Sequence, residues 1–248
     1  MCTLEKRGNI YILTLIGPGE HRLNPTLFDS IQSALRRLRA EPASPSSALI
    51  TTAQGKFFCN GYDLAWARSA PSTAITQSRY QLMSSKLRSL ISDLISLPMP
   101  TIAAVTGHAS AGGFIFALGH DYMLMRKDRG FLYMSELDIG LVIPAWFNAI
   151  LKSKIGDTNV RRELVLTAAR LTAEMAVERR IIQSAHDSSE ATIEAAGRLG
   201  EELVNRKWDG HVYAKNRLAV WGREVLDKIG FDEIVEGQNG DSNDKSKL

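Results

Sequence analysis

The sequence predicts an α/β fold in which strands and helices alternate over the N-terminal two-thirds, while helices alone form the last third. Apolar runs of strand length, such as Asn9 to Leu15 and Thr101 to Thr106, alternate with stretches that repeat apolar residues at helical spacing. Towards the C-terminus the helical spacing continues without a strand pattern between the helices. Alternation of this kind is typical of a sheet whose strands are joined by helical crossover connections.

Length and composition fit one large domain, or one domain with an appendage. The chain has 248 residues, of which 44% are hydrophobic and 23% charged, as in ordinary globular proteins. The net charge is only +3, and the basic cluster Arg36, Arg37 and Arg39 lies on the polar side of a helical pattern, so nucleic-acid binding is not indicated. Cys2 and Cys59 form neither a metal-ligand spacing nor a disulfide framework, which favours a reducing compartment.

The N-terminal elements read as strand, helix and strand. Asn9 to Leu15 has high β-propensity and is the first expected strand. Asn24 and Pro25 have the residue types of a helix N-cap and first helical position, and apolar residues then recur at helical spacing to Arg39. A short strand is expected over Ala48 to Thr52.

The middle of the chain carries the most informative stretch, Pro100 to Asp121. Before it, Gln54 to Leu64 reads as a loop with a glycine, and a helix follows that extends to Leu97. Within the stretch, the small residues His108 to Gly113 separate an apolar strand from the apolar run Phe114 to Leu118. A strand that turns into a helix leaves backbone N–H groups free at the helix N-terminus, where they can hold an anion or a developing oxyanion. The glycines are equally compatible with a helix that simply packs tightly against its strand.

The remaining elements follow from periodicity. Strands are expected at Tyr122 to Met125 and Phe131 to Met134, followed by a loop from Ser135 to Gly140. The expected helices cover Ala145 to Lys154, Val160 to Ala169, Thr172 to Arg179, Glu190 to Arg206 and His211 to Lys228.

Glu136 is the first candidate for acid–base chemistry. It follows an apolar strand, so its carboxylate is expected to be partly desolvated, which raises proton affinity and improves a general base near neutral pH. A surface glutamate is the alternative interpretation. His108 and His120 are weaker candidates, and Asp63 reads best as a helix cap. No Ser-His-Asp order, HExxH, Walker A or GxGxxG pattern is present.

The C-terminal residues predict a location. Ser246, Lys247 and Leu248 form the tripeptide of a peroxisomal address, which an import receptor reads, and no apolar signal peptide is seen at the N-terminus. The polar residues before this tripeptide are expected to be flexible. The predicted divisions are therefore a core at 1–188, a helical region at 189–236 and a flexible tail at 237–248, in a protein of the peroxisomal matrix.

Four motifs in register resemble the crotonase superfamily, the enoyl-CoA hydratases and isomerases. They are Phe58 to Leu64, Ile102 to Gly113, Glu136 to Pro144, and Leu171 to Glu174. The resemblance implies a crotonase-like spiral of repeated ββα units with a C-terminal helical region. In this family such helices build a trimer interface or cover the site.

The resemblance also implies a set of site residues. The oxyanion hole would use the backbone N–H groups of Asn60 and Gly112. The residues expected to bind substrate are Asn60, Gly61, Tyr62, Asp63, Leu64 and Gly112. The apolar residues expected to wall the acyl pocket are Ile115, Phe116, Ile143, Trp146 and Phe147.

One departure from the family pattern bears on the reaction. Hydratases of this family carry two glutamates; here Ile115 corresponds to the first and Glu136 to the second. A single acid disfavours addition of water but suffices for a 1,3-proton shift that converts a 3-enoyl-CoA to its 2-trans isomer in β-oxidation. The alternatives are another acyl-CoA enzyme of the family (a dienoyl-CoA isomerase, hydratase or hydrolase) and a non-catalytic acyl-CoA-binding subunit. The resemblance implies a homotrimer or hexamer, with no cofactor beyond the substrate's coenzyme A. The residues themselves predict no metal site, and polar residues interrupt the apolar run within Pro100 to Asp121, so no membrane span is expected.

Overall fold

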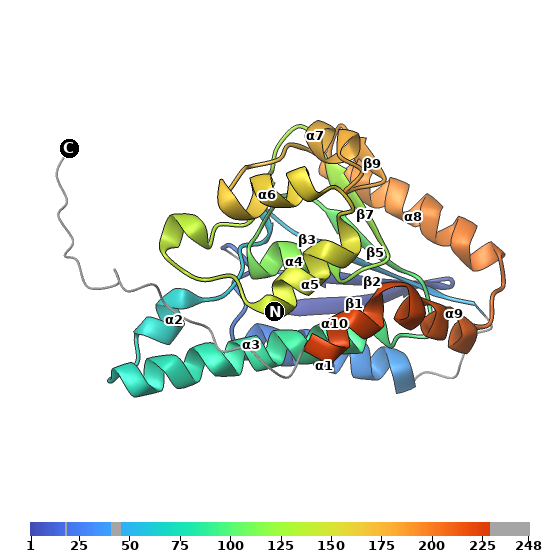
Figure 1. Cartoon of the computed structure of the whole chain (residues 1–248). Helices are drawn as coiled ribbons and strands as arrows, with labels where there is room; N and C mark the ends of the chain where they lie inside the picture. Colours follow the sequence, from blue (N-terminus) through green and yellow to red (C-terminus); the bar gives the residue numbers. More distant parts are fainter. Residues whose placement is uncertain (18, 41–45, 229–248) are drawn as a thin grey trace.

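The computed structural model describes residues 1–17, 19–40 and 46–228 and shows two β-sheets surrounded by helices (Figure 1). In the larger sheet β1 and β2 are antiparallel and every other neighbouring pair is parallel. In spatial order its six strands are β1 (Cys2–Arg7), β2 (Ile10–Leu15), β3 (Ala48–Ala53), β5 (Thr101–Val105), β7 (Tyr122–Arg126) and β9 (Ser184–His186).

The smaller sheet is parallel and consists of β4 (Phe57–Cys59), β6 (His108–Ser110) and β8 (Leu132–Tyr133). The chain alternates between the two sheets, because β3 leads to β4, β5 to β6 and β7 to β8. Each pass therefore contributes one strand to each sheet, with helical connections between passes. This arrangement confirms the predicted spiral of ββα units.

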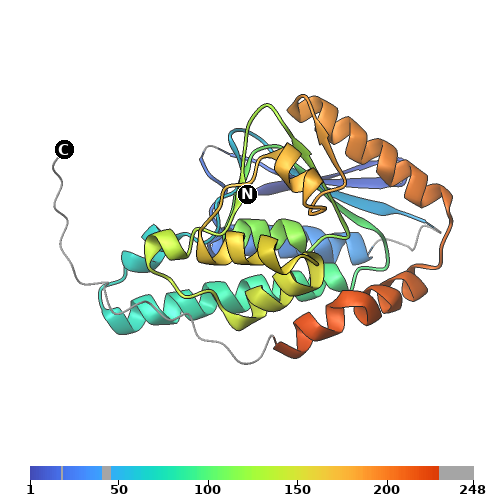
Figure 2. The same ribbon diagram turned by 45° about the horizontal axis from the view of Figure 1, so that its top comes forward.

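The two faces of the larger sheet are covered by different helices, as the alternation of side chains along a strand requires. On β5, Ile102 and Ala104 pack with apolar residues of α8 (Ser189–Asn205). Ala103 and Val105 point to the opposite face, into the main core. That core is shared with α1 (Pro25–Ala40), α3 (Thr73–Ile95) and α4 (Gly112–Leu118). Figure 2 shows α8 on the side of the sheet away from α1 and α3.

The remaining helical elements lie on the connections after β4 and β8 and at the C-terminal end of the described chain. They are α2 (Leu64–Arg68), the 3₁₀ turn η1 (Leu137–Ile139), α5 (Ala145–Lys154), α6 (Thr158–Leu166), α7 (Ala173–Glu178), α9 (Gly210–Arg217), the π-helical turn η2 (Leu218–Gly222) and α10 (Arg223–Lys228). Of these, η2 and α10 pack against α5 of the same chain (Figure 1).

A buried ion pair fastens the C-terminal helices to the core. The guanidinium of Arg217, on α9, contacts the carboxylate of Asp121 at 2.6 Å, and the two side chains are only 2% and 9% exposed. Arg217 also donates to the carbonyl oxygens of Ile95, Leu97 and Met99, so its charge is fully partnered. A buried charge of this kind needs such partners to offset its desolvation.

Several expected features are confirmed, and four strands were missed: β1, β9, and the three-residue strands β4 and β6, which were expected as a loop and a turn. Asn24 caps α1 and Thr172 caps α7, each accepting a hydrogen bond from a main-chain N–H of the first turn. The prediction that the last third is all helix is wrong, because β9 adds an edge strand beside β7. β1 was missed as well; it is largely exposed and polar, so it lacks an apolar strand pattern.

None of the helices within the described ranges is both long and apolar enough to cross a membrane. The predicted targeting residues Ser246, Lys247 and Leu248 lie outside the described residues, as does the predicted tail at 237–248. The predicted boundary at residue 188 stays a prediction.

Candidate active site

The carboxyl ends of the three short strands of the smaller sheet meet at one edge, and each leads into one part of the site. β4 is followed by the loop Asn60 to Tyr62, β6 by Ala111 and the start of α4, and β8 by Ser135 and Glu136. Because the strands are parallel and adjacent, segments far apart in the sequence are brought together here. The fold thus gathers three of the four motifs that carry the family resemblance.

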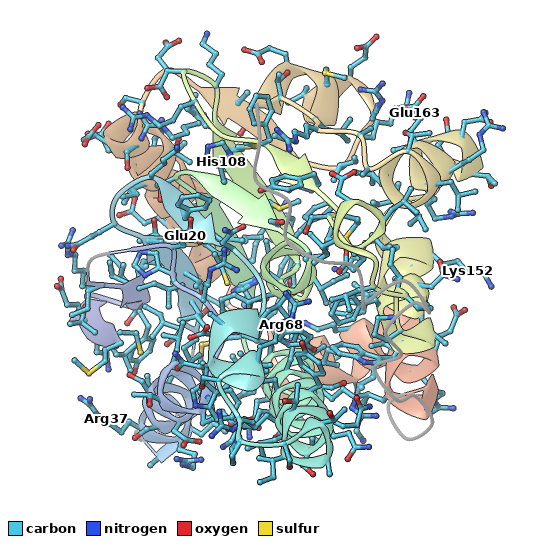
Figure 3. All side chains as sticks on the ribbon, turned by 90° about the vertical axis from the view of Figure 1, so that its left-hand side faces the viewer. Glu20, Arg37, Arg68, His108, Lys152 and Glu163 are labelled. Atoms are coloured by element: carbon cyan, nitrogen blue, oxygen red, sulfur yellow. The ribbon has the colours of Figure 1, made fainter. Side chains whose placement is uncertain are left out.

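A cavity of 680 Å³ opens at this edge. Figure 3 views the face of the molecule on which Arg68, one of its wall residues, lies. The apolar wall residues are Tyr62, Leu64, Ala65, Ala111, Ile139, Leu141, Val142, Pro144 and Phe147. The polar wall residues are Arg22, Asn60, Arg68, Ser110, Tyr133, Ser135, Glu136, Asp138 and Arg170.

Glu136 is the buried carboxyl group of this cavity. The residue is 5% exposed, and within the described ranges its Oε2 atom has no hydrogen-bond partner. Burial raises the pKa of Glu136 to about 7, because the charged form is poorly solvated. Its main-chain carbonyl accepts from Ile139 and Leu141 at 3.2 and 2.9 Å, which fixes the turn that holds the side chain. A carboxyl group with this pKa can accept and return a proton near neutral pH.

The N-terminus of α4 supplies a main-chain donor. Gly112 is its first residue, and nothing in the described part of the chain accepts a hydrogen bond from its N–H. The preceding residue, Ala111, has φ +49°, a conformation uncommon for a residue with a side chain. Its N–H donates to the carbonyl of Tyr133 at 2.9 Å, which ties the start of α4 to β8.

The loop after β4 supplies a second donor, which is the N–H of Tyr62. The carbonyl of Gly61 accepts from Leu23 at 2.7 Å, and the N–H of Asp63 donates to Leu23 at 3.0 Å. Since main-chain groups alternate in direction along an extended segment, the N–H of Tyr62 points away from Leu23. The described residues offer it no acceptor. A Cβ atom placed on Gly61 would lie 3.3 Å from the nitrogen of Gly112, so the loop touches the start of α4.

The predicted oxyanion role of the Asn60 N–H is wrong for this structure. That N–H donates to the main-chain carbonyl of Glu20 at 3.0 Å and is therefore already used. The donor left free on this loop is two residues further on, at Tyr62. Asn60 still lines the cavity, where its side-chain amide donates to the carboxylate of Glu20 at 2.8 Å.

Of the six residues expected to bind substrate, Asn60, Tyr62 and Leu64 line the cavity, whereas Gly61, Asp63 and Gly112 are not among its described wall residues. Gly61 has φ +71°, which a residue with a side chain would rarely adopt. Asp63 accepts from the N–H of Trp66 at 3.0 Å, which confirms its interpretation as a helix cap.

Of the five residues expected to wall the acyl pocket, only Phe147 belongs to the cavity wall. Ile115, Phe116 and Trp146 are fully buried in the core instead. Ile143 is partly buried and packs against that core. Apolar periodicity identified these residues as interior, but it could not tell the core from the wall of a cavity.

Three basic residues of the cavity wall were not found from the sequence. They are Arg22, Arg68 and Arg170. Arg68 donates to the hydroxyl of Tyr80 at 3.1 Å, and the guanidinium of Arg170 lies 5.4 Å from the ring centre of Tyr133. Arg22 precedes α1, Arg68 ends α2 and Arg170 lies between α6 and α7, and no local pattern distinguishes them from other surface arginines.

The two histidines considered as candidates lie outside the cavity wall. His120 is buried, and its Nε2 lies 2.8 Å from the hydroxyl of Thr51. Burial lowers the pKa of His120 to about 4, so it is neutral and structural. His108 packs between the rings of Phe57 and Phe131.

Residues 5–220 match the family model described as enoyl-CoA hydratase/isomerase. The chain belongs to this family. It is 56% identical over 230 residues to enoyl-CoA delta isomerase 1, peroxisomal, of Arabidopsis thaliana, with 93% of each chain covered. It is 49% identical over 236 residues to enoyl-CoA delta isomerase 2, peroxisomal, of the same plant, covering 95% of this chain and 98% of the relative.

The fold of this enoyl-CoA hydratase/isomerase family member also matches solved structures. A probable enoyl-CoA hydratase from Mycobacterium tuberculosis superposes with a TM-score of 0.81 at 20% identity, covering 92% of this chain and 91% of the other. At that identity the match supports the crotonase fold.

Proposed function

We propose that this protein is a Δ3,Δ2-enoyl-CoA isomerase, which moves the double bond of a 3-enoyl-CoA to the 2-trans position. The observation that carries the proposal is Glu136, the one buried carboxyl group among the described wall residues, with a pKa of about 7. The cavity wall also includes Tyr62 and Ala111, and the N–H groups of Tyr62 and of Gly112, which follows Ala111, have no acceptor among the described residues. Relatives at 49% and 56% identity bear the name enoyl-CoA delta isomerase, which supports the same activity.

The proposed reaction is a proton shift through a dienolate. The carboxylate of Glu136 takes a proton from C2 of the substrate, and the electron pair of that C–H bond moves towards the thioester oxygen. The N–H groups of Tyr62 and Gly112 stabilise the negative charge that develops on this oxygen. The protonated Glu136 then returns the proton at C4, so that the double bond lies between C2 and C3 and the enzyme is regenerated.

The surroundings of Glu136 favour isomerisation over hydration. Addition of water needs two groups that hold the water and move protons, and Ile115 stands fully buried where hydratases of the family carry their first glutamate. The other carboxylate among the described wall residues, Asp138, is exposed to solvent on η1. Apolar walls such as Leu141 and Phe147 limit the access of water to the dienolate.

The remaining features of the proposal follow from the substrate and the relatives. The substrate brings its own coenzyme A, so the proton shift requires no further cofactor or metal. Two relatives are named peroxisomal, and this supports a peroxisomal location and recognition of Ser246, Lys247 and Leu248 by an import receptor. Assembly as a homotrimer or hexamer is part of the proposal and is checked by light scattering.

The test is a substrate assay with one variant and one control. The purified protein is incubated with a 3-enoyl-CoA, a 2-enoyl-CoA and a saturated acyl-CoA. The first is expected to be converted to the 2-trans isomer, the second is expected not to be hydrated, and the third is expected not to react. Glu136→Gln is expected to lower turnover by about a hundred- to ten-thousandfold, the range of a general base, while acyl-CoA binding persists. Asp138→Asn, which removes the exposed carboxylate of the same cavity, is expected to retain most of the turnover. Near wild-type turnover by Glu136→Gln would remove Glu136 from this role.

A further inference from the structure

The segment that precedes α1 is hydrogen-bonded to the loop that carries the Tyr62 N–H. Besides the two main-chain hydrogen bonds of Leu23, the thiol of Cys59 donates to the carbonyl of His21 at 3.1 Å. Residues 20–23 therefore run alongside residues 59–63 and contact them at several points. The direction of the Tyr62 N–H depends on a partner segment almost forty residues away in the sequence.

Glu20 accepts two hydrogen bonds from a single residue of this loop, Asn60. Its main-chain carbonyl accepts from the N–H of Asn60 at 3.0 Å, and its Oε2 accepts from the side-chain amide of Asn60 at 2.8 Å. The same Oε2 accepts from Nε of Arg22 at 2.7 Å. The amide of Asn60 is also the main reason why the pKa of Glu20 lies below its ordinary value. Asn60 is thus held to one residue through both its main chain and its side chain.

The flexibility of Gly61 is the reason why its neighbours in the loop must be held in place. It is the residue between Asn60 and Tyr62, and its positive φ is a conformation that glycine adopts freely but does not fix. The peptide that carries the Tyr62 N–H is held at its own carbonyl by Leu23, and contacts on both sides of Gly61 fix the residues that flank this peptide. Asn60 is held on one side by Glu20, and on the other side Nη1 of Arg22 lies 3.4 Å from the carbonyl of Tyr62.

We propose that Glu20 and Asn60 are positioning residues for the reaction, since their paired hydrogen bonds aim the Tyr62 N–H at the thioester oxygen. This inference rests on the proposed function. It assigns the side chain of Asn60 a role that its occupied N–H cannot have. Glu20 lies on the face of the molecule that Figure 3 presents.

The exposure of the Glu20 side chain and of its ion pair with Arg22 separates an effect on the reaction from an effect on folding stability. The side chains of Glu20 and Arg22 are 38% and 40% exposed, and ion pairs exposed to this extent contribute little to folding. A displacement of about 1 Å in a catalytic group, in contrast, can cost about a hundredfold in rate. Loss of the Glu20–Asn60 hydrogen bond is therefore expected to slow the reaction while leaving the protein folded.

The first experiment measures kcat and KM of Asn60→Ala and Glu20→Ala with a 3-enoyl-CoA. Each is expected to lower kcat about tenfold, less than the hundred- to thousandfold loss that follows removal of a whole donor, with KM changed by less than about twofold. Glu20→Gln keeps an acceptor for Asn60 and is expected to recover most of the kcat lost in Glu20→Ala. The double alanine variant is expected to be no slower than either single variant, because both remove the same hydrogen bond.

Two matched controls lie away from the site. Gln32→Ala removes another side-chain amide that donates to a carboxylate, that of Asp93 at 3.2 Å. Glu5→Ala removes another carboxylate paired with an arginine two residues on, Arg7 at 3.0 Å. Both controls are expected to keep wild-type kcat and KM.

The second experiment does not depend on turnover. A saturated acyl-CoA labelled with ¹³C at the thioester carbonyl is bound to each protein, and the carbonyl stretching frequency is read by difference infrared spectroscopy. Wild-type protein is expected to lower this frequency, because two N–H donors polarise the carbonyl; Asn60→Ala is expected to lose about half of that change. A merely structural role for Asn60 would leave the frequency of the folded variant unchanged.

The outcomes separate this inference from the proposed function. Wild-type kcat and carbonyl frequency in Asn60→Ala, or a raised KM with unchanged kcat, would overturn the positioning role. Failure of Glu20→Gln to recover activity would also overturn it. If the wild-type protein shifts the carbonyl frequency but isomerises nothing, the proposed function fails, and the frequency in Asn60→Ala still decides the positioning role.

Discussion

Replacing Glu136 with glutamine is expected to stabilise the folded protein at neutral and higher pH. Glutamine has nearly the same shape but carries no charge, so it removes the cost of burying a carboxylate in a cavity where Oε2 has no partner among the described residues. Burial moves the pKa of Glu136 from 4.5 to about 7. At about 1.4 kcal/mol per pKa unit, this difference corresponds to about 3 kcal/mol of unfolding free energy.

The sign of the effect follows from proton binding. Below pH 4.5 Glu136 is protonated in both the folded and the unfolded chain, so wild type and Glu136→Gln are expected to be equally stable. Between pH 4.5 and about 7 the folded protein keeps a proton that the unfolded chain has released, so the wild type loses stability as pH rises. Above about pH 7 the loss is complete, and the glutamine variant is expected to be more stable by up to about 3 kcal/mol.

Urea unfolding at pH 4.5 and at about pH 8 measures this difference. Both proteins are compared at the same concentration, because association of folded chains also adds to apparent stability. A stability difference between wild type and variant that is the same at both pH values would refute the reasoning. It would show that the Glu136 carboxyl is not desolvated in the folded protein.

Two further predictions concern the reaction and the packing of α4. The kcat/KM of isomerisation is expected to rise with pH through about 7 and then level off, because Glu136 must be ionised to accept the proton. A pH–rate profile measures this change. A flat profile between pH 5.5 and 8.5 would contradict the assignment of Glu136 as the base. Gly113→Ala would place a methyl group 2.1 Å from a carbonyl oxygen of β4 and is expected to cost about 3 kcal/mol or more in urea unfolding. Gly197→Ala, within α8 and with nothing within 4 Å, is expected to stabilise by about 0.5 to 1 kcal/mol, and equal effects of the two substitutions would contradict the packing argument.

The sequence could predict those parts of the fold that depend on local pattern. Apolar periodicity placed α5 over Ala145–Lys154 and α1 from its Asn24 cap onwards, since these signals lie within the elements themselves. β1, β4, β6 and β9 were missed because an edge strand of polar residues, or a strand of only three residues, is stabilised by pairing with a distant neighbour. Such pairing leaves no mark within the strand's own residues.

In the candidate site, too, only the features that depend on local sequence could be predicted. Glu136 could be recognised because its motif and its position after an apolar strand both indicate a desolvated acid. The direction of the Tyr62 N–H could not, because it is set by hydrogen bonds to Leu23 on another connection of the fold. The oxyanion role that the family resemblance implied for the Asn60 N–H failed for that reason, because a sequence motif does not report which main-chain donor is already used.

The burial of Ile115 limits what protein engineering could achieve here. Ile115 is fully buried in the main core, and it is not among the described residues of the cavity wall. A glutamate introduced there would be surrounded by hydrocarbon and would hold its proton, so it could not activate water. Turning this scaffold into a hydratase would therefore require repacking the neighbours of Ile115 to admit solvent, rather than a single exchange of side chains.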